Sequence, residues 1–325
     1  GNEVITVDNS ATTRRLGTPS HWYNRSIKMD STSLQLFSDW NEWFATELKL
    51  ARKEIATGQD SLLGTQFAEM RIFTDVPGTG SSVWVGPDFS RHANALTNDL
   101  DAIKLKGSFF LGDHTLMVGF EREMLEIFNL FVASSRGQYE FNSIDLFEQQ
   151  IANSMFYSNA FTNDANDGAA LFGYDVDSFY VQDEWQATPD FKIQAGVRLD
   201  KFSSSDLPPL NQNFQNRYGF SNQNTLDGRD LIQPRIGFNW QWRPETTVYG
   251  GWGLFGGGTP NVWVSNSFPN DGVAVVQTNI NQSTPQPYRG QALTGVDGFN
   301  IAPEVLAQHL LLRGDGETNS VDPDF

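Results

Sequence analysis

The 325-residue sequence contains no cysteine, which excludes disulfide bonds, a thiolate nucleophile and cysteine-bound metal. It also has no run of about 18 apolar residues, so we expect no transmembrane helix. Positive charge is scarce, because 22 Lys and Arg stand against 39 Asp and Glu. A net charge of −17 leaves no basic stripe, and we expect no nucleic-acid partner.

The two ends of the sequence lack the features of natural termini. Residues 1–10 have neither an initiator Met nor the basic and apolar segments of a signal peptide, and residues 320–325 have loop-like composition. We therefore expect an internal part of a longer chain.

Catalytic and metal-binding motifs are also missing. The four histidines, at positions 21, 92, 114 and 309, show none of the spacings that bind zinc. The loop at 162–168 has Ala165 where a calcium loop needs an oxygen ligand, which favours an Asx-rich turn. We expect no enzyme activity, no cofactor and no metal.

What the sequence does contain is strand-like alternation. From Phe191 to Asp200, apolar and polar residues alternate without error, and residues 179–186 do the same except at Asp183. Alternate side chains of a strand point to opposite faces, and Pro189 lies in a short turn between the two segments. The pattern predicts a long hairpin with one apolar and one polar face.

Four more hairpins follow from the same reasoning, together with two short loop helices at 144–151 and 303–312 and a long excursion at 123–173. The hairpins comprise residues 33–51, 67–86, 102–121 and 232–255. Their turns are short, whereas the connections between hairpins are long. Short turns at one end, long loops at the other and strands of about 9–11 residues are typical of an outer-membrane β-barrel. A half-buried sheet in a soluble sandwich alternates too, so that alternative stays open.

Particular stretches resemble a known family. They are GPDFSRHANAL (86–96), LGDHTLMVGFERE (111–123), FGYDVDSFYVQDEWQATPDFKIQAGVRLDKF (172–202) and QPRIGFNWQWRPETTVYGGWGLF (233–255). Together they are similar to the barrel of TonB-dependent outer-membrane receptors, and most similar to the Oar-like group. The resemblance implies a barrel of about 22 strands, a plug domain and a TonB-type energising complex.

We thus predict an all-β, antiparallel transmembrane barrel, partial, with about ten strands and long extracellular loops that carry short helices. Residues 1–32 would lead into the barrel, 33–255 would form its hairpins, and 256–325 would be an extracellular loop region. The polar faces of the hairpins would line the lumen and are the candidate substrate contacts: Lys104, Lys106, Gln182, Glu184, Lys192, Gln194, Arg198, Arg235 and Asn239.

The predicted function is ligand capture by extracellular loops and import through a plugged barrel in the bacterial outer membrane. The expected partners are outer-membrane lipid, the plug, the TonB-type complex and an extracellular ligand that the sequence does not identify. The alternatives are a passive porin or adhesion-type barrel, and a secreted carbohydrate-binding β-sandwich.

Overall fold

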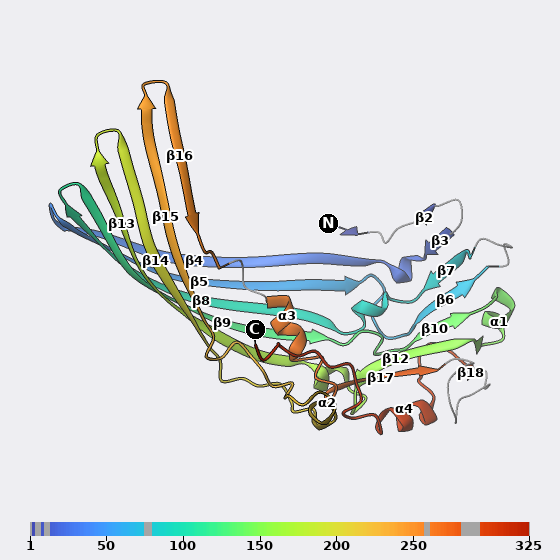
Figure 1. Ribbon diagram of the computed structural model, residues 1–325. Coiled ribbons are helices and arrows are strands. Elements are labelled where there is room, and N and C mark those ends of the chain that lie inside the picture. Colours follow the sequence, from blue (N-terminus) through green and yellow to red (C-terminus); the bar gives the residue numbers. More distant parts are fainter. Residues whose placement is uncertain are drawn as a thin grey trace.

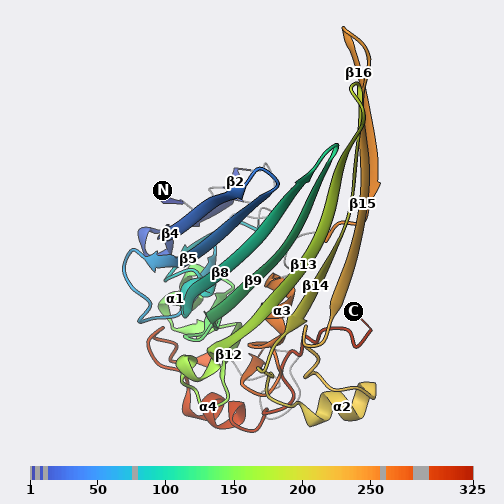
Figure 2. The same cartoon turned by 90° about the vertical axis from the view of Figure 1, so that its left-hand side faces the viewer.

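The computed structural model describes residues 2–3, 8–9, 14–74, 80–256, 261–280 and 293–324. These residues form a long, curved sheet and a second, smaller sheet near one of its ends (Figure 1). Viewed from the side, the hairpin turns of the long strands gather at one end, and the loops and helices lie at the other (Figure 2). The short-turn and long-loop asymmetry predicted from the sequence is therefore confirmed.

The long sheet, which we call the barrel sheet, is antiparallel throughout and runs in the order β1-β4-β5-β8-β9-β13-β14-β15-β16. Its strands are β1 (Asn2–Glu3), β4 (Tyr23–Asn41), β5 (Phe44–Ser61), β8 (Asn94–Leu111), β9 (His114–Phe131), β13 (Ala170–Thr188), β14 (Phe191–Ser203), β15 (Asp230–Arg243) and β16 (Thr246–Gly253). The described part of the sheet does not close on itself. Four of the five predicted hairpins lie in it.

The strands are longer than predicted. β4 begins at Tyr23, so the expected boundary between residues 32 and 33 falls inside a strand, and β9 continues to Phe131 although a loop was expected from residue 123. The reason is a change in the outward-facing side chains, which are apolar up to Phe120 on β9 and then include Arg122. Beyond that point both faces of the strand mix polar and apolar residues, so the alternation disappears while the pairing continues.

The predicted hairpin at 67–86 is correct as a pair but wrong as part of the barrel. β6 (Glu69–Phe73) and β7 (Ser82–Val85) pair antiparallel in a second sheet, and residues 75–79 of the expected turn lie outside the described residues. With five and four residues, these strands are too short to cross a membrane. The expected ten barrel strands are therefore eight long strands and the short β1.

The second sheet, which we call the outer sheet, runs in the order β17-β12-β10-β6-β7-β3-β2. Its other strands are β2 (Asp8–Asn9), β3 (Arg14–Gly17), β10 (Gln138–Phe141), β12 (Ser154–Ala160) and β17 (Val275–Ile280), and β11 (Ile151–Ala152) pairs separately with β18 (Leu293–Thr294). β10 pairs parallel to β6, and β3 pairs parallel to β7. One face of the sheet packs into a core that contains Phe141 and Tyr157, which are 0% and 2% exposed. The outer sheet is thus assembled from loops far apart in the sequence.

Both predicted loop helices are present but shorter. α1 (Ile144–Glu148) begins after Ser143, whose hydroxyl accepts a hydrogen bond from the backbone N–H of Leu146. α4 (Pro303–His309) has proline in its first turn as predicted, but it ends before Leu312. Two helices were not predicted, α2 (Gln212–Tyr218) and α3 (Asn261–Ser267). None of the helices in the described ranges is long and apolar enough to cross a membrane.

Candidate functional site

The register of the barrel sheet places all nine predicted lumen residues on one face. Residues directly opposite each other in an antiparallel pair point to the same side. Lys104 lies opposite Glu121, which lies opposite Ser178, and Ser178 in turn lies opposite Asp200. The strand pairing places all nine predicted lumen residues on the face of Lys104, which we call the inward face. Whether they contact a substrate remains a prediction.

The opposite face is apolar and exposed. Its side chains that are at least 38% exposed include Leu34, Leu36, Leu50, Ile103, Leu105, Val118, Phe179, Val181, Val197, Ile232, Ile236, Phe238 and Trp240. Soluble monomers rarely expose a contiguous apolar surface of this extent. It is the surface that a barrel presents to lipid, so the polar face is the lumen side.

Most of the charged groups on the inward face are already paired with one another. Arg198 is the centre of the largest group: it donates to Glu121 at 2.8 Å, to Asp200 at 2.7 Å and to the hydroxyl of Ser178 at 2.7 Å. Lys104 lies 3.3 Å from the same Glu121 carboxylate. These contacts connect β8, β9, β13 and β14 across the wall.

Two smaller groups of paired side chains lie on the same inward face. Glu184 accepts from Lys192 at 2.9 Å and from Gln194 at 2.6 Å, and Lys106 pairs with Glu47. Three of these partners, Glu47, Glu121 and Asp200, were not among the predicted site residues. All three occupy polar positions of the same alternation. Only the pairing between strands, which the sequence does not show, was needed to identify them as partners of the predicted residues.

Gln182, Gln194 and Arg235 border a groove of about 500 Å³ on the inward face. Its floor contains four glycines on β14, β15 and β16. Gly237 lies opposite Gly251, whereas Gly196 and Gly253 lie on the two sides of Arg235. The absence of side chains at these positions leaves the backbone open to a docked molecule. Asn239 lies on the same face, two residues from Gly237.

Nearer the loops, the inward face is covered by α3. The ring of Phe268, just after α3, stacks on Phe172 of β13 with 4.2 Å between centroids, and Val264 packs in the same cluster. Asn129 of β9 donates to the hydroxyl of Ser265 at 2.9 Å. Part of the region expected as an exposed extracellular loop therefore folds back against the lumen side.

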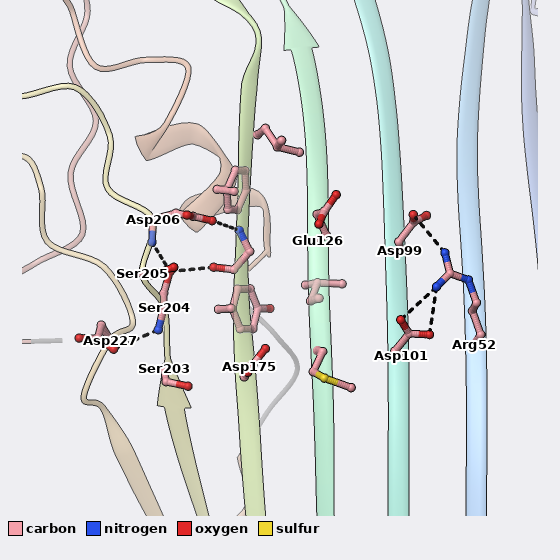
Figure 3. A pocket seen from close by; sticks show the side chains of 16 residues that line it. Arg52, Asp99, Asp101, Glu126, Asp175, Ser203, Ser204, Ser205, Asp206 and Asp227 are labelled. Carbon is pink, nitrogen blue, oxygen red and sulfur yellow. Dashed lines mark hydrogen bonds and ion pairs between the residues drawn. The ribbon is translucent and has the colours of Figure 1, made fainter.

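A second cavity, of about 890 Å³, lies on the outward side above the apolar surface (Figure 3). Figure 3 shows Arg52 directed toward Asp99 and Asp101, at 3.8 Å and 3.1 Å. Across the cavity, the carboxylate of Asp206 accepts from the backbone N–H of Gly173 at 2.7 Å. These charged side chains lie on the outward face of the barrel sheet, so at this height the strands extend beyond the apolar layer of the membrane.

Comparison with known proteins agrees with a barrel in the outer membrane. Residues 53–325 match the model of the outer membrane beta barrel domain. The chain belongs to this family. As a member of the outer membrane beta barrel family, the protein resides in the outer membrane, and the alternative of a secreted β-sandwich is wrong.

Two solved structures resemble this member of the family. One is the outer membrane transporter YddB from Escherichia coli, with 11% identity and a TM-score of 0.47, covering 85% of this chain and 34% of YddB. The other is the copper transporter OprC, with 12% identity and a TM-score of 0.40, covering 72% of this chain and 31% of OprC. The chain therefore spans about a third of the length of either transporter. No curated protein matches the sequence.

Proposed function

We propose that this chain forms part of the wall and outer surface of a TonB-dependent receptor of the Oar-like type. Such a receptor captures a ligand with its outer loops and imports it through a plugged barrel, and it is no enzyme. The observation that carries the proposal is the inward face, on which charged groups are paired among themselves beside an open, glycine-floored groove.

A wall of this kind suits a plug that must leave or rearrange during transport. Charges that already have partners offer a plug little electrostatic attraction, and paired groups exposed to water contribute only about 0–1 kcal/mol each. The groove can instead position the plug by shape. A passive porin needs no such docking surface.

The test is the steady conductance of the full-length receptor in planar bilayers. We expect a closed wild type. Gly237→Trp fills the groove, since a Cβ at Gly237 would meet only the carbonyl oxygen of Gly250 within 4 Å, at 3.6 Å. We expect this variant to fold, to dislodge the plug and to conduct, whereas the Gly237→Ala control stays closed.

A wild type that conducts steadily without an energy source would instead identify a passive porin. Energy dependence is tested separately, by comparing ligand accumulation in cells with and without a functional TonB-type complex. Equal accumulation in the two strains would contradict active transport.

A further inference from the structure

Two sequence stretches that the barrel does not use meet at the outer sheet. His21 ends the 3₁₀ helix η1 (Pro19–His21), and Asp88 caps the 3₁₀ helix η2 (Phe89–Arg91). Glu69, the first residue of β6, lies between them. One nitrogen or oxygen from each of these three side chains lies within 4.8 Å of the others. It is the single such group of potential metal ligands among the described residues.

The distance between His21 and Glu69 has the spacing of metal ligands. Its Nδ1 lies 3.6 Å from Oε1 of Glu69 and 3.1 Å from the carbonyl oxygen of Gly86. Donor atoms around a tetrahedral ion with bonds of about 2.0–2.2 Å are roughly 3.3–3.6 Å apart. The separation of Nδ1 from Glu69 fits two ligands of one ion, whereas the shorter contact with Gly86 is a hydrogen bond.

Two of these groups are also buried. Glu69 is 0% and His21 is 4% exposed. Burial raises the pKa of Glu69 to about 8, with the neighbouring Asp88 acting in the same direction, and burial lowers the pKa of His21. Both oxygens of Glu69 accept hydrogen bonds, Oε1 from the backbone N–H of Phe89 at 3.2 Å and Oε2 from Gln138. The Asp88 carboxylate lies 3.6 Å from Arg91.

A second buried imidazole lies beside the cluster. His92 is 6% exposed, and its Nδ1 accepts a hydrogen bond from the backbone N–H of Arg136 at 3.1 Å. Its Nε2 has no hydrogen-bond partner in the described part of the chain. His92 directly follows η2, the 3₁₀ helix that Asp88 caps.

We propose that His21, Glu69 and Asp88 bind a divalent transition-metal ion. The donor set favours Zn²⁺: nitrogen argues against Ca²⁺ and Mg²⁺, which prefer oxygen ligands alone, and the chain has no thiolate to favour a softer ion. The ion binds Nδ1 of the neutral His21 imidazole, whose single proton then resides on Nε2, and Glu69 releases its carboxyl proton to solvent when it binds.

The role of the ion is structural. It connects η1, which precedes β4 of the barrel sheet, to β6 and to the β7–β8 connection. The outer sheet is thereby fixed to the rim of the barrel. This site could not be predicted from the sequence, because its ligands come from three separate segments with no short spacing between histidines.

The test uses the full-length protein purified in detergent, stripped with a chelator and then exposed to ZnCl₂ or CoCl₂. We expect about one tightly bound zinc per chain by elemental analysis, and the visible absorption of four-coordinate Co²⁺. His21→Asn and Glu69→Gln should each lose the bound ion. His114→Asn, which alters an exposed histidine paired with Asp183 at 2.7 Å, is the matched control and should keep it.

A wild type that retains no zinc and gives no Co²⁺ absorption would overturn the proposal, and this measurement needs no variant. Unchanged zinc content in a folded His21→Asn protein would overturn it as well. Heat-modifiability on a detergent gel shows which variants have folded. The outcome does not depend on whether the receptor is energised by TonB.

Discussion

In the barrel sheet, Val118, Val181 and Val197 lie side by side on three strands and are 39–45% exposed. In the outer sheet, Phe141 and Tyr157 are almost completely buried. The difference shows that the barrel sheet needs lipid to cover its apolar side chains, whereas the outer sheet buries its own. We expect the two regions to respond separately to mutation and to pH.

The largest difference between the responses of the two sheets should come from Phe141→Ala, which destabilises the outer sheet alone. Phe141 of β10 is fully buried and packs edge-on against Phe147 of α1, with 5.2 Å between centroids. Truncation leaves a cavity that costs about 3–5 kcal/mol, confined to the outer sheet. Protease added to intact cells should cut the outer loops faster, while the barrel keeps its heat-modifiable band.

The control for this prediction is Phe299→Ala, since Phe299 is 67% exposed and its removal creates no buried cavity. Loss of the barrel band in Phe141→Ala would show that the two sheets unfold as one unit.

The opposite difference should come from Val181→Arg, which destabilises the barrel sheet. Val181 faces lipid between Val118 and Val197, and an arginine near the middle of the membrane costs about 2–4 kcal/mol. The adjacent Gln182→Arg places the same group on the lumen side and should cost little. Urea unfolding in lipid vesicles, followed by tryptophan fluorescence, measures the difference. Equal stability of the two variants would contradict the assignment of the faces.

The same contrast explains how much could be predicted from the sequence. The barrel hairpins join neighbouring segments, so the alternation from Phe191 to Asp200 was enough to place β14 and the face of each residue. The outer sheet brings together Gln138 and Glu69 in a parallel pair. Strands of four or five residues carry too little alternation to reveal pairing between distant loops.

The candidate site divides in the same way. The lumen face was predictable, because Lys104 and Arg198 follow the alternation of their own strands. Their shared partner Glu121 was not, because the register between strands decides which charges meet. The glycine-floored groove was missed for a related reason: Gly196 and Gly237 have no side chains to mark a site until the strands are aligned.

The smallest expected effect is a pH dependence confined to the outer sheet. His309 of α4 is 0% exposed; its Nδ1 lies 3.1 Å from the hydroxyl of Thr278, and its Nε2 lies 3.2 Å from the carbonyl oxygens of Asn159 and Ala160. Burial lowers the pKa of His309 below its usual value of 6.5, and no charged group contributes to the shift.

Below about pH 6.5, His309 is therefore protonated in the unfolded chain but still neutral in the folded protein. The free energy of unfolding falls as the pH drops from 6.5 toward the pKa of His309 in the folded protein. The loss is at most about 1.4 kcal/mol per pH unit. Proteolysis of the outer loops should accelerate at pH 5 relative to pH 7.5, and His309→Gln, which keeps a donor for the two carbonyls, should weaken this dependence. Among the described residues, the strands of the barrel sheet contain no buried histidine, so the urea midpoint of this sheet should not follow the change. A parallel shift of that midpoint would show that lipid and the buried core stabilise one cooperative unit instead of two.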